Sequence, residues 1–124
     1  MTLDLYYAPT PNGWKTTIMI EELREAGVAL PETQFHRVDL AKGEQFSDAF
    51  TAINPNQKIP ALVHDGQAIM ESGTILHYLA ERFGGPLLPE GPGRWQALAW
   101  VTWQAANLGP VFGNKLSYTR YIDV

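Results

Sequence analysis

The sequence predicts an α/β fold with a mixed β-sheet, and three observations favour this class. A short aromatic-rich run at 3–7 precedes a stretch with helical apolar spacing, and a second strand-like run follows at 35–38. These segments make a β-α-β unit, whose strands are parallel. Asp65-Gly66 lies between two further strand-like runs and predicts a two-residue hairpin, whose strands are antiparallel.

The first predicted helix has start and stop signals in the sequence. Thr10 is a favourable N-cap, Pro11 fits the first helical position, and Gly27 fits the position just past the helix end. We expect the helix between these limits to pack on the sheet through an apolar face made of Met19, Ile20, Leu23 and Ala26.

The segment from 43 to 84 supplies the remaining elements of this domain. Residues 43–52 predict a short helix that closes at Asn54-Pro55-Asn56, and strands are expected at 61–64 and 67–70. Residues 72–83 predict a third helix with an apolar face made of Leu76, Leu79 and Phe83. The order β-α-β-α-β-β-α is that of a thioredoxin-like fold with a four-stranded mixed sheet.

The last third of the chain differs in character. Residues 85–93 contain three Pro and three Gly and predict a linker. Residues 94–108 predict a helix that is apolar nearly all round, and such a helix needs burial on more than one side. We therefore expect a sheet domain at 1–84, a linker at 85–93 and the incomplete start of a helical domain at 94–124, which ends in a short tail from residue 113.

The composition argues against several classes of function. A net charge of −4 without a basic run argues against a nucleic-acid or anionic-membrane surface. The absence of Cys excludes disulfides, cysteine metal sites and a Cys-x-x-Cys redox pair. No apolar run approaches the ~20 residues of a membrane span, and the first residues lack the pattern of a secretory signal. A cytoplasmic location is the default expectation.

Two short segments carry the functional signal. Pro60 cannot donate a backbone hydrogen bond and biases Ile59 towards an extended conformation, so the N–H and C=O of Ile59 can pair with a group outside the sheet. Glu71 and Ser72 stand at a helix start, where unpaired N–H groups and the positive dipole end suit a carboxylate. Together these features suit a small acidic peptide.

With Tyr7-Ala8-Pro9-Thr10-Pro11-Asn12-Gly13, these segments resemble the glutathione-binding half of the glutathione transferase family. The Thr-Pro-Asn segment is similar to the nu-class, disulfide-reductase-like branch. The resemblance runs from about residue 3 to 84 and weakly onward to 113. In this family the helix after the linker opens an all-helical second domain, so the resemblance implies that the chain is truncated within that domain.

The resemblance implies roles for individual residues, with glutathione as cosubstrate. It implies that Thr10 and Asn12 hold the glutathione sulfur, where a hydroxyl donor and a helix dipole both lower the pKa of a thiol. It assigns the γ-glutamyl amino and carboxylate groups to Glu71 and Ser72. The other contacts that it implies are the main chain of Ile59, Pro60 as a cis proline, and Lys58 and Gln45 for the second carboxylate.

Other interpretations of these residues remain open. Thr10 and Asn12 also fit ordinary helix capping. Tyr6 or Tyr7 at the end of the first strand could contact the sulfur instead, although strand packing is favoured for both. We interpret the histidines as structural or surface residues, because metal-ligand spacing is lacking at His36, His64 and His77. An aromatic stripe favours a core or a subunit interface over an electrophile pocket for Trp95, Trp100 and Trp103.

Two functions follow from these expectations. The first is a glutathione-dependent transferase or disulfide-bond oxidoreductase, in which the bound glutathione thiolate attacks a small electrophile or a disulfide. The alternative is a non-catalytic glutathione-fold binding or regulatory module. A homodimer is expected in either case, because proteins of this family usually pair with two-fold symmetry.

Overall fold

The computed structural model describes residues 1–121, so the last three positions of the predicted helical segment, 122–124, lie outside the described residues. The chain divides into two compact units, Met1–Leu88 and Pro89–Val124. The division falls inside the linker predicted at 85–93. That the second unit is the start of a larger helical domain stays a prediction.

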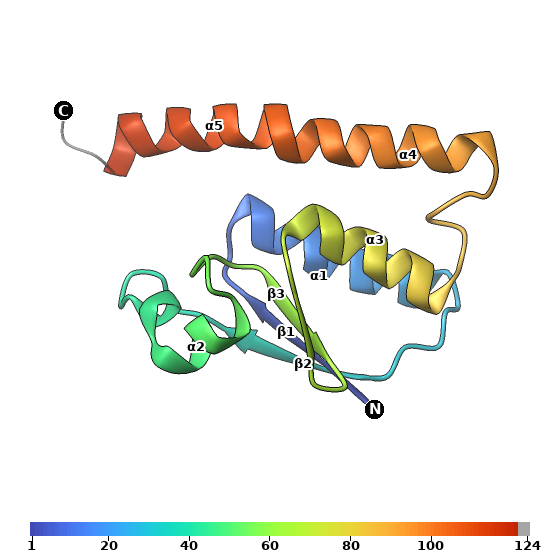
Figure 1. Ribbon diagram of the computed structural model, residues 1–124, viewed down its shortest axis with the longest axis horizontal. Coiled ribbons are helices and arrows are strands. Elements are labelled where there is room, and N and C mark those ends of the chain that lie inside the picture. The colour runs from blue at the N-terminus through green and yellow to red at the C-terminus, as the bar shows by residue number, and fades with distance from the viewer. Residues whose placement is uncertain (122–124) are drawn as a thin grey trace. The chain divides into compact units, whose positions relative to one another are not determined.

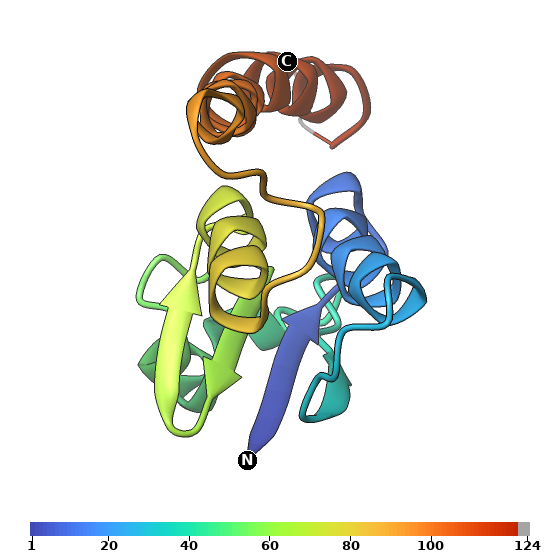
Figure 2. The ribbon, with the colours of Figure 1, turned by 90° about the vertical axis from the view of Figure 1, so that its right-hand side faces the viewer.

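The first unit is built on a four-stranded mixed sheet with the strand order β2-β1-β3-β4. The strands are β1 (Thr2–Tyr7), β2 (Glu32–Arg37), β3 (Ala61–His64) and β4 (Gln67–Met70). β1 pairs parallel with β2 and antiparallel with β3, and β3 pairs antiparallel with β4. Figure 2 shows the β1 and β4 arrows running in one direction and the β3 arrow in the other. The predicted mixed sheet is confirmed.

Helices cover both faces of this sheet (Figure 1). α1 (Pro11–Glu25) and α3 (Ser72–Phe83) pack against each other and against one face, whereas α2 (Asp48–Ile53) lies at the other. The core under α1 and α3 consists of Leu3, Leu5, Ile20, Leu23, Leu62, Ile69, Ile75 and Leu79. A smaller cluster beside α2 consists of Val38, Phe50 and Ala61.

The predicted limits of α1 are confirmed, but its predicted face is only partly correct. Thr10 is the N-cap, and Gly27 adopts a φ of +78° directly after the C-cap. The buried side of the helix is formed by Gly13, Thr16, Ile20 and Leu23, whereas Met19 is only partly buried and Ala26 is exposed. Thr16 is tolerated inside because its hydroxyl donates a hydrogen bond to the Gly13 carbonyl at 2.8 Å.

Three other elements differ from the sequence prediction. β2 covers 32–37 instead of 35–38, and the Val38 N–H beyond it donates to the Tyr7 carbonyl at 2.7 Å. The helix predicted at 43–52 is a 3₁₀ turn η1 (Glu44–Phe46) followed by α2, because Ser47 caps α2 by accepting the Phe50 N–H. In α3 the bounds are confirmed, but the buried apolar residues are Ile75, Leu79 and Ala80, while Leu76 and Phe83 are partly buried.

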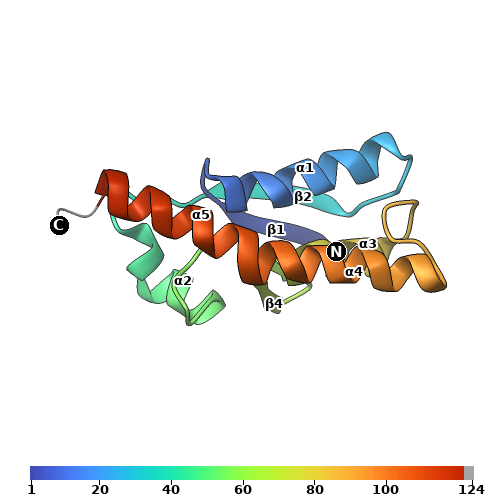
Figure 3. The same ribbon diagram turned by 90° about the horizontal axis from the view of Figure 1, so that it is seen from above.

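Residues 92–121 of the second unit form one continuous helical rod, as Figure 3 shows, so the helix extends beyond the predicted 94–108 into the segment from residue 113. Its parts are α4 (Pro92–Trp103), a π-helical turn η2 (Gln104–Leu108), α5 (Gly109–Leu116) and a second π-helical turn η3 (Ser117–Tyr121). Pro110 would end a regular helix. The wider π turn directly before it is a local adjustment by which a helix continues past a proline.

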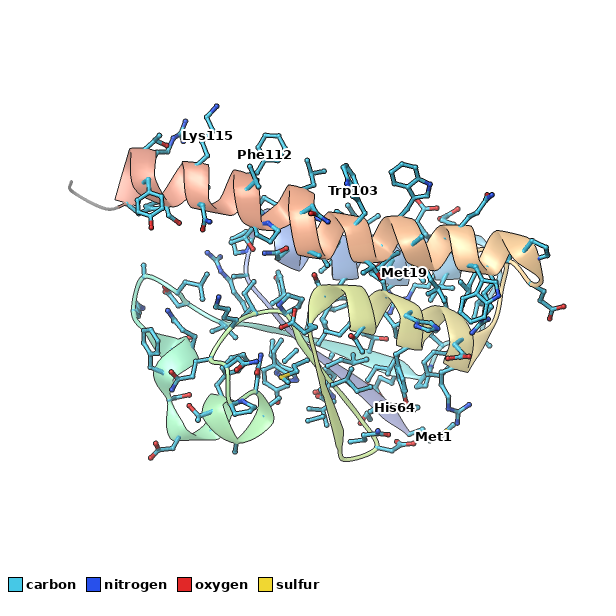
Figure 4. All side chains as sticks on the ribbon, turned by 45° about the horizontal axis from the view of Figure 1, so that its top comes forward. Met1, Met19, His64, Trp103, Phe112 and Lys115 are labelled. Atoms are coloured by element: carbon cyan, nitrogen blue, oxygen red, sulfur yellow. The ribbon has the colours of Figure 1, made fainter. Side chains whose placement is uncertain are left out.

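Within the described part of this rod no residue of its helices is fully buried. Large side chains such as Trp103 and Phe112 project from it (Figure 4). The exposed aromatic residues are Trp95, Trp100, Trp103, Phe112, Tyr118 and Tyr121. Among the residues that the structure describes, no helix is long and apolar enough to cross a membrane.

Candidate functional site

The sheet register brings the three predicted site segments to one edge. Tyr6 near the end of β1 pairs with Ala61 at the start of β3, and Ala61 in turn pairs with Met70 at the end of β4. The loop after β1, the loop before β3 and the turn after β4 therefore meet at the same edge of the sheet (Figure 2). These connections carry Thr10, Ile59 with Pro60, and Glu71 with Ser72.

Thr10 keeps a hydrogen-bond donor available at this edge. Its side-chain oxygen accepts the N–H of Gly13 at 3.3 Å, as an N-cap does. A hydroxyl that accepts through a lone pair still has its proton to donate. The hydroxyl of Thr10 can therefore cap α1 and donate to a ligand sulfur at the same time. Asn12 is exposed in the first turn of the same helix, so its amide is accessible as a second donor.

Gly13 allows a close backbone approach at this edge that the sequence alone did not reveal. A Cβ placed on it would overlap the carbonyl oxygen of Ala8, which is a backbone atom and cannot move aside easily. Only glycine lets the first turn of α1 approach the end of β1 this closely. Gly13 lies in the first turn of α1, and its contact with Ala8 appears only in three dimensions.

In the loop before β3, the backbone groups of Ile59 are without hydrogen-bond partners among the described residues. The Ile59–Pro60 peptide is cis, as the resemblance predicts, and Pro60 is buried while Lys58 is exposed. Within residues 1–121 neither the N–H nor the C=O of Ile59 makes a hydrogen bond. A partly buried peptide group without a partner is costly, so this position can accept the main chain of a ligand.

The start of α3 is open to an anion. Its N-cap is Glu71, and no side chain among the described residues caps it. The first intrahelical hydrogen bond runs from the Ile75 N–H to the Glu71 carbonyl at 2.9 Å, which leaves the earlier N–H groups of the helix available. Ser72 is only 8% exposed, and within the described residues its hydroxyl has no hydrogen-bond partner. These donors suit a carboxylate.

Glu71 adopts an unusual backbone conformation, with φ +72° and ψ +122°. Positive φ is disfavoured for a residue that carries a Cβ and costs about 1–3 kcal/mol. The exposed side chain of Glu71 makes no core contact that would account for this. Such strain clusters at ligand sites, so it supports a binding role for this residue.

Lys15 is a second residue that the sequence did not identify. It lies in the first half of α1, the helix that packs beside α3. Burial lowers the pKa of Lys15 below its ordinary value, and the negative charge of Glu71 opposes this shift. A cation near the open end of α3 adds to the electrostatic attraction for an anion at that edge. The α1–α3 packing that creates this proximity is tertiary, so no local pattern marks Lys15.

Gln45 stands apart from the three segments, in η1 beyond the end of β2. Its Oε1 atom is buried without a hydrogen-bond partner among the described residues. An unsatisfied buried polar atom costs about 1–3 kcal/mol. This side chain therefore has unused hydrogen-bonding capacity, although none of its contacts places it with Lys58.

Tyr6 and Tyr7 both have ring partners that support the packing interpretation. Tyr6 stacks on His36 with ring centroids 4.6 Å apart and packs on the cluster beside α2. Tyr7 meets Phe35 edge to face at 6.3 Å and packs on the larger core. The contact of Thr10 and Asn12 with a ligand sulfur, in place of Tyr6 or Tyr7, stays a prediction.

Each histidine has a polar partner. His36 lies 2.7 Å from Asp4, His64 lies 2.6 Å from the hydroxyl of Tyr78, and His77 lies 3.3 Å from Glu81 one turn along α3. His64 is buried close to the N-terminal end of β1 (Figure 4). Over the described range 1–121, no group of three or more His, Cys, Asp or Glu residues could hold a metal ion.

Comparisons with known proteins identify relatives of this chain. The family model for the glutathione S-transferase N-terminal domain matches residues 1–81. The disulfide-bond oxidoreductase YfcG of Escherichia coli is 44% identical over an alignment of 120 residues, and the match covers 91% of this chain and 53% of that protein. The chain thus spans about half the length of this relative.

Solved structures with similar folds contain glutathione. A glutathione transferase family member from Pseudomonas fluorescens, with two glutathione bound, has 37% identity and a TM-score of 0.83, and the match covers 96% of this chain and 52% of that one. A glutathione transferase from Pseudomonas putida, with one glutathione disulfide bound per subunit, has 38% identity and a TM-score of 0.82. That match covers 98% of this chain and 53% of the other.

Proposed function

Because this chain belongs to the glutathione transferase family, we propose that it binds glutathione at the edge where β1 and β4 end and β3 begins. The observation that carries the proposal is that three unsatisfied groups meet there: the donor of Thr10, the main chain of Ile59 and the open end of α3. A γ-glutamyl carboxylate fits α3, the cysteine main chain fits Ile59, and the sulfur then lies towards Thr10.

We propose that the bound thiol performs the chemistry. Thr10 and Asn12 donate hydrogen bonds to the sulfur, which favours the thiolate. The thiolate attacks one sulfur of a disulfide, so a new S–S bond forms with glutathione, the old S–S bond breaks, and the leaving thiolate takes a proton from water. A second glutathione attacks the mixed disulfide and releases the other thiol. The substrate disulfide is reduced, and two glutathione molecules are oxidised to glutathione disulfide.

The names of the relatives support this reaction class for the chain. YfcG is a disulfide-bond oxidoreductase, and the Pseudomonas putida structure contains glutathione disulfide. Transfer of glutathione to an electrophilic carbon uses the same activated thiolate and is the second reaction that we propose to test. In that case a C–S bond forms and the leaving group departs with the electron pair.

Calorimetric titration with glutathione tests the site, and reduction of a small glutathione mixed disulfide tests the reaction. Binding with turnover supports the proposed enzyme. Binding without turnover identifies a glutathione-binding module instead. No binding of glutathione or its disulfide at millimolar concentration overturns the proposed site.

We also propose that two copies of the chain associate. The second unit exposes six large aromatic residues, and contiguous apolar patches beyond a few hundred Å² mark interaction surfaces. A two-fold dimer buries the same patch on both copies.

A further inference from the structure

Asn54 is a buried polar residue in the segment between α2 and the cis peptide. It is the C-cap of α2 and only 3% exposed. Its side-chain oxygen accepts the N–H of Asn56 at 2.9 Å, and its side-chain nitrogen donates to the carbonyl of Lys58 at 2.8 Å. Its own carbonyl accepts the N–H of Gln57 at 3.0 Å. One residue therefore holds the next turn of chain at three points.

The loop that Asn54 holds contains a disfavoured backbone conformation and two further side-chain contacts. Gln57 adopts a φ of +57°, which is disfavoured for a residue with a side chain. Its amide donates to the Thr51 hydroxyl at 3.0 Å, and the Asn56 amide contacts the Met70 sulfur at 3.4 Å. The hydrogen bonds of Asn54 thus stabilise a conformation that the backbone alone would not favour.

The bond to the Lys58 carbonyl has a geometric consequence for the next residue. The carbonyl of Lys58 and the N–H of Ile59 belong to one planar trans peptide, in which they point in opposite directions. Asn54 binds the carbonyl on the buried side of the loop. The N–H of Ile59 is thereby directed away from Asn54, and it has no partner within the described residues.

We propose that Asn54 is a positioning residue of the glutathione site, which fixes the Lys58–Ile59 peptide so that the Ile59 N–H faces the cysteine carbonyl of the ligand. This inference rests on the proposed function. Without the side-chain donor of Asn54, the peptide can rotate, and the Ile59 N–H loses its orientation. Asn54 itself does not touch the ligand.

The test compares two ligands on the Asn54→Asp variant. Aspartate keeps the size of the side chain and the acceptor for Asn56, but it cannot donate to the Lys58 carbonyl. γ-Glutamylcysteamine keeps the γ-glutamyl group and the thiol but lacks the cysteine carbonyl. Asn54→Asp should weaken glutathione roughly 5- to 10-fold, as expected for one hydrogen bond, and should change the binding of γ-glutamylcysteamine less than about 2-fold.

Matched controls separate positioning from a general effect on folding. Asn56→Ala alters the same loop but not the Lys58–Ile59 peptide, and it should leave both affinities unchanged. Thermal unfolding verifies that each variant is folded. If aspartate prevents folding, Asn54→Ser replaces it, because the shorter hydroxyl cannot reach the Lys58 carbonyl. In the wild type, the amide proton of Ile59 should gain protection from exchange with glutathione but not with γ-glutamylcysteamine.

Each outcome bears on one conclusion. If Asn54→Asp loses affinity equally for both ligands, or loses none for glutathione, the positioning role is overturned while the proposed function stands. Protection of the Ile59 amide by both ligands would also overturn it. A wild-type protein that binds no glutathione refutes the proposed function, and the inference with it.

Discussion

The side-chain oxygen of Thr10 accepts the Gly13 N–H at 3.3 Å, and the same glycine packs directly against the carbonyl of Ala8. This pair of contacts ties the first turn of α1 to the end of β1. The proposed sulfur-binding groups therefore depend on a close backbone approach that only glycine allows.

Gly13→Ala should destabilise the protein, because the added Cβ would collide with the Ala8 carbonyl. Overpacking of this kind costs about 1–3 kcal/mol, measured as the free energy of unfolding in urea. Gly113→Ala is the matched control, since a Cβ at Gly113 meets nothing within 4 Å. In a helix that change is neutral or stabilising by up to about 1 kcal/mol. Equal effects at both glycines would contradict the proposed close approach.

Thr10→Ala should lower turnover more than it lowers glutathione affinity, because the hydroxyl acts on the charge that develops on sulfur. A lost transition-state donor costs about 2.7–4 kcal/mol in the strongest cases. We expect a smaller loss here because Asn12 supplies a second donor, and the double variant Thr10→Ala, Asn12→Ala should be slower still. Thr10→Ser keeps the hydroxyl and serves as the control. Full activity in the double variant, with loss in Tyr6→Phe or Tyr7→Phe, would assign the sulfur contact to a tyrosine.

Local signals in the sequence predicted much of the fold. The turn at Asp65-Gly66 gave the bounds of β3 and β4, and the capping signals at Thr10 and Gly27 gave those of α1. The comparisons with known proteins confirm the predicted family and its thioredoxin-like fold. These features follow from residues close together in sequence, which is why a single chain reveals them.

Other features depend on contacts between distant segments. Lys15 lies in α1 and Glu71 at the start of α3, and neither residue predicts their interaction by itself. The rod also continues past Pro110, where sequence rules predict that a helix ends. The assignment of individual site residues to glutathione came from the resemblance, and it stays a prediction until it is measured.

Glu71→Ala should weaken glutathione roughly 10- to 100-fold, because hydrogen bonds to a charged group are worth about 1.5–3 kcal/mol. Calorimetric titration measures this loss, and Glu25→Ala, which removes an exposed carboxylate from the last turn of α1, is the control. Glu71→Gly should bind as poorly as Glu71→Ala but unfold less easily by about 1 kcal/mol, because glycine tolerates a φ of +72°. Unchanged affinity in both variants would exclude Glu71 from the site.

The pH dependence of stability should reveal the environment of Lys15. Burial lowers its pKa in the folded protein below the ordinary value of 10.5, so the unfolded chain binds more protons between the two pKa values. The contribution of Lys15 to the free energy of unfolding therefore rises as the pH is raised from the folded pKa to 10.5. When the pH is lowered through the folded pKa, this contribution is lost. The difference in unfolding free energy between wild type and Lys15→Met isolates this effect.

The Glu71 carboxylate opposes the shift at Lys15, which gives a second, independent measurement. Glu71→Gln should lower the pKa of Lys15 further, because the opposing charge is removed. NMR titration of the Lys15 side chain in both proteins measures the change. An identical pKa in the two proteins would show that these side chains do not interact.

The exposed aromatic residues of the second unit predict self-association. Trp100 and Trp103 meet edge to face at 5.4 Å, and Trp100 is 67% exposed. Trp100→Glu should shift the protein towards the monomer in sedimentation at tens of micromolar, because a charge would be buried in an apolar interface. Gln96→Glu adds the same charge in the same helix without removing an aromatic ring. A monomeric wild type, or equal dissociation of Trp100→Glu and Gln96→Glu, would contradict the aromatic interface. The proposed glutathione site lies in the first unit and does not depend on this result.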